Sequence, residues 1–147
     1  MKKIYEVQHI KQVVREVEET WSPIASPTDA VEMVQGIIGD VDREVLLVLV
    51  LNTKNRVVAI HQAHTGSLNS SIVHPREVFK AAILNNGASI IVSHNHPSGD
   101  TEPSEEDIQI TKRLQKAGTC LGIQVLDHLI VSQGASYTSL RERGDMR

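Results

Sequence analysis

An unbroken aliphatic run, Val45–Leu51, is the feature that most limits the folds open to this chain. A strand with one face in water alternates apolar and polar residues, whereas a run without alternation indicates a strand covered on both faces. The next residues repeat the strand signal, since Asn52–Asn55 has the composition of a turn and Val57–His61 that of a returning hairpin strand. We therefore expect a central strand from Glu44 to Leu51.

Helices and strands alternate along the rest of the chain. This order predicts an α/β fold in which helices flank a mixed β-sheet. Residues 3–17 fit either a helix or an irregular strand, and their pattern does not decide between the two. We expect residues 1–25 to be an N-terminal extension and residues 26–147 to form one domain. One helix is expected from Ser26–Pro27 to Gly39, a second from Pro75 to Asn86–Gly87, and a third from Ser104. The further expected strands are Ser70–Val73, Ala88–Ser93, Ile123–Val131 and a short one around Tyr137.

Composition narrows the function. With 40% apolar but only 3% aromatic residues, the core must be built from aliphatic side chains. The net charge of −3 and the lack of an aromatic stacking platform both argue against direct DNA binding by this chain. No stretch has the length and apolarity of a membrane span or a signal peptide, so we expect a cytoplasmic protein. The single cysteine, Cys120, excludes an internal disulfide framework and a cysteine-rich zinc site. The oligomeric state cannot be read from these features.

The run HNHPSGDTEPSEED, residues 94–107, carries the chemistry. If the preceding strand continues through His96, the side chains of His94 and His96 point to the same face. If Ser104 begins the next helix, Asp107 lies in its first turn and can turn back toward the histidines. Two neutral imidazoles and one carboxylate leave a fourth position open, which is how a catalytic zinc is usually held.

Each part of this run also has a simpler interpretation. Ser104-x-x-Asp107 is a helix N-cap pattern, and an isolated pair of histidines is more often a surface or core feature than a metal site. The combination favours a site, because it follows the apolar strand 88–93 and because α/β sites form beyond the carboxyl ends of strands. The turn expected at Pro97–Asp100 connects the histidine pair to the Ser104-x-x-Asp107 unit.

Two other metal chemistries use related residues. A zinc nucleobase deaminase needs a cysteine pair and a His-x-Glu unit, which a chain with one cysteine does not provide. An iron(II) oxygenase uses two histidines and one carboxylate, as here, but leaves the Ser-x-x-Asp start of the helix unexplained. Anaerobic metal analysis separates iron from zinc.

The spacing His94-x-His96, seven residues, Ser104, two residues, Asp107 matches the JAMM (MPN+) metalloprotease motif without a gap. Together with VHPRE at residues 73–77 and VLDH at residues 125–128, it makes the chain resemble the RadC branch of that superfamily over about residues 26–144. The resemblance implies a cytidine-deaminase-like fold and Zn²⁺ as the metal. Longer RadC proteins carry an N-terminal helix-hairpin-helix DNA-binding region, and we expect this chain to be the short form without it.

The resemblance also implies a reaction. Members of the JAMM superfamily carry a general base that is a glutamate at the start of a long apolar strand, and Glu44 matches that position. Taken alone, Glu44 would be an ordinary charged residue at a strand end. Glu77 is the weaker candidate for the base. Ser104 matches the motif serine that donates to the developing oxyanion. The implied function is zinc-dependent hydrolysis of peptide or isopeptide bonds in a protein or peptide substrate, with Glu44 as general base toward water that zinc activates.

Two questions stay open at this point. An alternative function is a non-enzymatic metal-binding module associated with DNA repair or mobile elements, and intact ligands do not exclude it. The family name implies DNA repair, but no residue of this chain supplies a mechanism for it. His74, Asp127 and His128 match RadC-typical positions, where they either orient the metal ligands, line a substrate groove or make structural hydrogen bonds.

Overall fold

The expected α/β architecture is confirmed. The computed structural model describes residues 1–18, 22–69 and 71–146. The helices and strands follow in the order α1 (Pro27–Ile38), β1 (Val45–Leu51), β2 (Val57–Thr65), α2 (Pro75–Leu84), β3 (Ser89–Asn95), α3 (Glu105–Leu121), β4 (Gln124–Val131), β5 (Tyr137–Ser139) and α4 (Leu140–Arg143).

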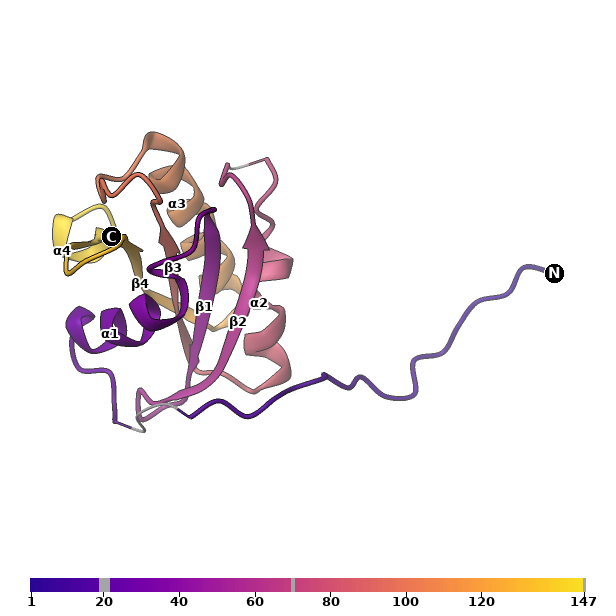
Figure 1. Ribbon diagram of the computed structural model, residues 1–147. Coiled ribbons are helices and arrows are strands. Elements are labelled where there is room, and N and C mark those ends of the chain that lie inside the picture. The colour runs from indigo at the N-terminus through magenta and orange to yellow at the C-terminus, as the bar shows by residue number, and fades with distance from the viewer. Residues whose placement is uncertain (19–21, 70, 147) are drawn as a thin grey trace.

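The strands form a mixed sheet in the order β2-β1-β3-β4-β5. β1 is antiparallel to both β2 and β3, β3 is parallel to β4, and β5 is antiparallel to β4. α1 covers one face of the sheet, and α2 and α3 cover the other (Figure 1). α3 is the crossover between the parallel strands β3 and β4. Its N-terminus therefore lies near the edge of the sheet where β3 ends.

β1 has no polar residue because both of its faces are buried. Leu46, Val48 and Val50 pack in the core under α2 and α3, whereas the residues between them pack in the core under α1. This alternation is the two-residue period of a strand, with apolar side chains on both sides. β1 lies between β2 and β3, as expected for a central strand.

α3 begins where its sequence predicts, and its far end is fixed by a glycine. Ser104 is the N-cap, its Oγ accepts from Asp107 N at 3.1 Å, and Asp107 Oδ2 accepts from Ser104 N at 2.9 Å. Gly122 ends the helix in the left-handed region, with φ of 72°. Both ends of the helix that supplies Asp107 are therefore fixed locally.

Two expectations are wrong. Residues 3–17 form neither a helix nor a strand, and the extended N-terminal segment leads away from the sheet, with its apolar residues exposed (Figure 1). Ser71 and Ile72 lie in a turn and not in the strand expected over 70–73, whose first residue is outside the described part of the chain. Asn69 explains the turn, because its Oδ1 accepts from Ser71 N at 3.0 Å and its carbonyl accepts from Val73 N at 3.1 Å.

Smaller differences concern element ends. β2 continues to Thr65, beyond the expected end at His61, and α4 follows β5 without having been expected. β3 ends at Asn95, so His96 lies just outside the strand, although its N–H still donates to Val131 O at 2.8 Å. Among the described helices, none combines the length and apolarity needed to cross a membrane.

Candidate metal centre

Three polar side chains meet where β3 ends and α3 begins. His94 lies near the end of β3, His96 follows the strand, and Asp107 lies in the first turn of α3. His94 is fully buried, Asp107 is 3% exposed, and His96 is partly exposed. One ligand atom from each lies within 4.8 Å of the other two, so the group could hold a metal ion.

The candidate ligand atoms lie close to one another. His94 Nε2 lies 2.9 Å from His96 Nε2. The Asp107 carboxylate places Oδ1 at 3.3 Å from His94 Nε2 and Oδ2 at 3.3 Å from His96 Nε2. Zinc with bonds of about 2.0–2.1 Å keeps tetrahedral ligands about 3.3–3.4 Å apart. The two contacts with Asp107 match this spacing, and the distance between the two histidine nitrogens is shorter than it. The donor set fits zinc in type and number.

His96 is oriented by the turn that follows it. Its Nδ1 lies 2.7 Å from Asp100 O, and because a carbonyl only accepts, Nδ1 carries the hydrogen. In the neutral ring, Nε2 therefore presents its lone pair to the group. Gly99 makes this turn possible with φ of 91°, and its N–H donates to His96 O at 3.0 Å. The turn expected from Pro97–Asp100 thus positions a ring nitrogen.

The electrostatics of the group favour a cation. The hydrogen bond to Asp107 raises the pKa of His96 above its ordinary value, against the opposing effect of burial. Burial alone would raise the pKa of Asp107, but hydrogen bonds that the protonated imidazoles of His94 and His96 donate outweigh it and hold that pKa far below the usual range. A carboxylate ionised at all ordinary pH values therefore faces two imidazoles in a mostly buried site.

Glu44 lies at the same edge of the sheet. β1 runs antiparallel to β3 with Leu46 paired to His94, so the residue two places before Leu46 is level with His96. The charge of Glu44 contributes to the raised pKa of His96, which agrees with this placement. Its Oε2 accepts from Leu68 N at 3.1 Å, so the carboxylate is held in place.

Asn95, between the two histidines, was not singled out from the sequence. Its Oδ1 accepts from Val45 N at 2.8 Å, and its Nδ2 donates to Arg43 O at 2.8 Å. These two partners flank Glu44, so the Asn95 amide fixes the backbone on both sides of the carboxylate. The signal for it was its place in the strand, since a residue between His94 and His96 points to the other face.

Ser104 caps α3 and is exposed beside the group. In the cap its Oγ accepts a hydrogen bond, which leaves its own hydrogen for donation. Capping and donation to a substrate oxygen are therefore compatible.

The residues left open by the sequence have different surroundings. His128 is buried and its Nε2 lies 2.7 Å from His94 Nδ1, so it contacts a member of the group directly. Burial, followed by the charge of His94, holds the pKa of His128 well below its ordinary value. Asp127 instead accepts from Ser139 Oγ at 2.6 Å and from His128 N at 2.7 Å. His74 is the N-cap residue of α2.

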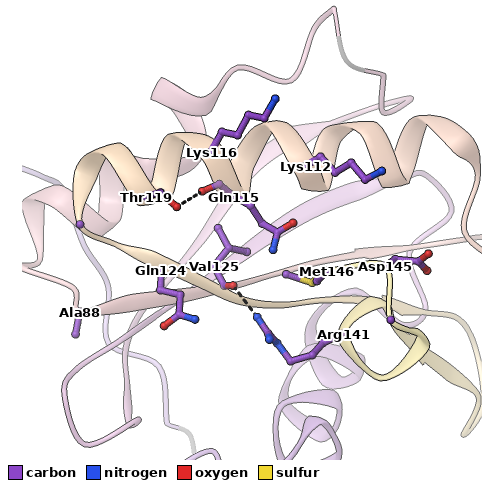
Figure 2. Close-up of a pocket in the computed structure, with 13 residues that line it drawn as sticks. Ala88, Lys112, Gln115, Lys116, Thr119, Gln124, Val125, Arg141, Asp145 and Met146 are labelled. Carbon is purple, nitrogen blue, oxygen red and sulfur yellow. Dashed lines mark hydrogen bonds between the residues drawn. The ribbon is translucent and has the colours of Figure 1, made fainter.

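A large cavity lies elsewhere on the molecule. It has a volume of about 1010 Å³ and lies between the last turns of α3, the start of β4 and the C-terminal segment. Its lining includes none of His94, His96 or Asp107. In Figure 2, Arg141 donates to the carbonyl of Val125, and Lys116 points away from Arg141. The metal group, and not this cavity, brings the candidate ligands together.

Comparisons with known proteins identify relatives over most of the chain. The family model described as RadC-like JAB domain matches residues 24–145. A UPF0758 protein of Clostridium beijerinckii is 52% identical over 121 residues, which cover 82% of this chain and 52% of the relative. The UPF0758 protein ABC2615 of Shouchella clausii is 50% identical over 134 residues, which cover 91% of this chain and 58% of the relative. The chain thus spans little more than half the length of these relatives.

Proposed function

This chain belongs to the RadC-like JAB domain family, and from that premise we propose that it is a zinc-dependent hydrolase of peptide or isopeptide bonds. The family is related to metalloproteases. The observation that carries the proposal is the convergence of two imidazole nitrogens and one carboxylate at distances of 2.9–3.3 Å. Such a donor set leaves one tetrahedral position for chemistry.

His94, His96 and Asp107 would hold the zinc. Zinc supplies Lewis acidity, which lowers the pKa of water and polarises a carbonyl group. The partial exposure of His96 and the exposure of Ser104 leave the group open to a substrate from the solvent side.

Glu44 is the proposed general base and acid. Its carboxylate takes a proton from water as the water oxygen attacks the scissile carbonyl, and it returns that proton to the leaving nitrogen as the carbon–nitrogen bond breaks. The hydrogen bond that Leu68 N donates to Glu44 Oε2 keeps the carboxylate at the edge of the sheet, level with His96. The Ser104 hydroxyl donates to the developing oxyanion, a contact of the kind whose removal costs about 2.7–4 kcal/mol in the barrier.

Replacing Glu44 tests the proposal. We expect Glu44→Gln to keep its zinc and to hydrolyse a library of internally quenched peptides and isopeptide-linked lysine peptides about 10²–10⁴-fold more slowly than wild type. Glu77→Gln is the matched control, because Glu77 is exposed and pairs with Lys80 at 3.0 Å on α2. Unchanged turnover in zinc-loaded Glu44→Gln contradicts the role of Glu44. Zinc binding without turnover of any substrate by wild type supports a non-enzymatic metal-binding module instead.

A further inference from the structure

A buried line of hydrogen bonds joins one candidate ligand to another. His94 Nδ1 lies 2.7 Å from His128 Nε2, and Thr111 Oγ1 is in hydrogen-bond contact with His128 Nδ1. Thr111 Oγ1 in turn donates to Asp107 O at 2.8 Å. We call these contacts the relay. It starts at the His94 side chain and ends at the backbone of Asp107.

The fold explains why these residues meet. His128 pairs with Val92 and Ile130 pairs with His94 in the parallel register of β3 and β4, so His94 and His128 point to the same face of the sheet. α3 covers that face, and Thr111 lies one turn after Asp107 on the side of the helix toward the sheet. His94, Thr111 and His128 are each 0% exposed, so these contacts are shielded from bulk solvent.

The polarity of the relay follows from counting hydrogens. The carbonyl of Asp107 can only accept, so the single hydroxyl hydrogen of Thr111 is used there. Thr111 Oγ1 must then accept from His128, which places the hydrogen of that ring on Nδ1. The remaining His128 nitrogen, Nε2, is left as an acceptor for the hydrogen on His94 Nδ1.

We propose that Thr111 and His128 are positioning residues that fix His94 as the Nδ1–H tautomer, so that its Nε2 lone pair faces His96 and Asp107. This inference rests on the proposed zinc site and extends it, because it names the residues that make His94 a competent ligand. The opposite polarity would place a hydrogen on His94 Nε2, where it would block a metal ion. Partners of this kind typically change metal affinity about 10–100-fold.

The first test needs no metal. Long-range ¹H–¹⁵N spectra of the zinc-free wild-type protein, assigned with single His→Gln variants, report which ring nitrogen carries hydrogen. We expect His94 and His128 both to be protonated on Nδ1. In spectra recorded where both rings are neutral, a hydrogen on Nε2 of either ring overturns the relay, whether or not any variant folds.

The second test measures zinc affinity by competition with a chromophoric chelator. We expect Thr111→Val to bind zinc about 10–100-fold more weakly than wild type, and Thr111→Ser, which keeps the hydroxyl, to bind close to wild type. Thr119→Val is the matched control, because Thr119 makes the same bond to the preceding turn of α3, donating to Gln115 O at 3.0 Å on an exposed face.

The outcomes separate this inference from the proposed function. A Thr111→Val protein that binds zinc as tightly as wild type overturns the positioning role. Wild-type protein that takes up no zinc contradicts the proposed function, whichever tautomer the spectra show. Wild-type protein that takes up zinc, but whose zinc-free form carries the His94 hydrogen on Nε2, contradicts the relay alone.

Discussion

Replacement of Asn95 by alanine should weaken both the fold and the proposed reaction while leaving the metal ligands in place. The Asn95 amide bonds to Val45 N, Arg43 O and Val41 O, all of which lie on the segment around Glu44. Its bonds do not involve the three candidate metal ligands. The variant therefore separates positioning of the carboxylate from metal binding.

The magnitude follows from which partners are left without a hydrogen bond. Val45 is 4% exposed, so its N–H loses its partner in a buried position, and this costs about 1–3 kcal/mol. Arg43 is exposed, so its carbonyl can bond to water and adds little. We expect the free energy of unfolding to fall by about 1–3 kcal/mol. If the whole effect reached Glu44, turnover would fall by about 5–150-fold.

Urea unfolding and zinc titration check this expectation. The unfolding midpoint of Asn95→Ala should fall with an unchanged slope, and zinc affinity should match that of wild type. Asn85→Ala is the control, because the Asn85 side chain also makes three hydrogen bonds, to Gln12 and Ala81, but at a more exposed position. A loss of stability within about 0.5 kcal/mol, as for an ordinary surface change, would refute the argument.

Three further predictions follow from the same structure. Zinc at about a hundred times its dissociation constant should raise the free energy of unfolding by about 2.7 kcal/mol, and neither chelator-treated protein nor Asp107→Ala should show this gain. In the zinc-free protein, the pKa of His96 is raised, so its pairing with Asp107 stabilises the fold fully below about pH 6.5. This contribution is lost as the pH rises through the pKa of His96 in the folded protein. In urea unfolding, Asp107→Asn should therefore lose more stability at about pH 5.5 than at about pH 8.5. Gly118→Ala should lose about 1–3 kcal/mol by thermal unfolding, because a Cβ there would lie 2.4 Å from Ile123 O, whereas Gly36→Ala, with open space around it, should not be destabilised.

Elements whose signals are local could be predicted from the sequence. Burial of β1 on both faces appears directly as an aliphatic run, and the capping pattern of Ser104 and Asp107 marks the start of α3. The prediction for residues 3–17 is wrong because a spacing of apolar residues indicates a helix or strand only where those residues pack against the rest of the protein. The apolar side chains of this segment are exposed. The turn at 71–72 depends on the Asn69 side chain, which outweighs the strand composition of its neighbours.

The candidate site divides in the same way. The spacing of His94, His96 and Asp107 is local, so the sequence indicated a group that the structure brings together. The partners of this group depend on tertiary register, which a single sequence does not encode in any short pattern. The contacts of Asn95 depend on the pairing of β1 with β3, and those of Thr111 depend on the position of α3 over the sheet.

Element-resolved metal analysis of the purified protein tests the central claim most directly. We predict one zinc ion per chain in wild-type protein and in Glu44→Gln, and loss of that zinc in both His94→Ala and Asp107→Ala. Wild-type protein without stoichiometric zinc, or full zinc retention in both ligand variants, would contradict the assignment of these side chains as a metal centre.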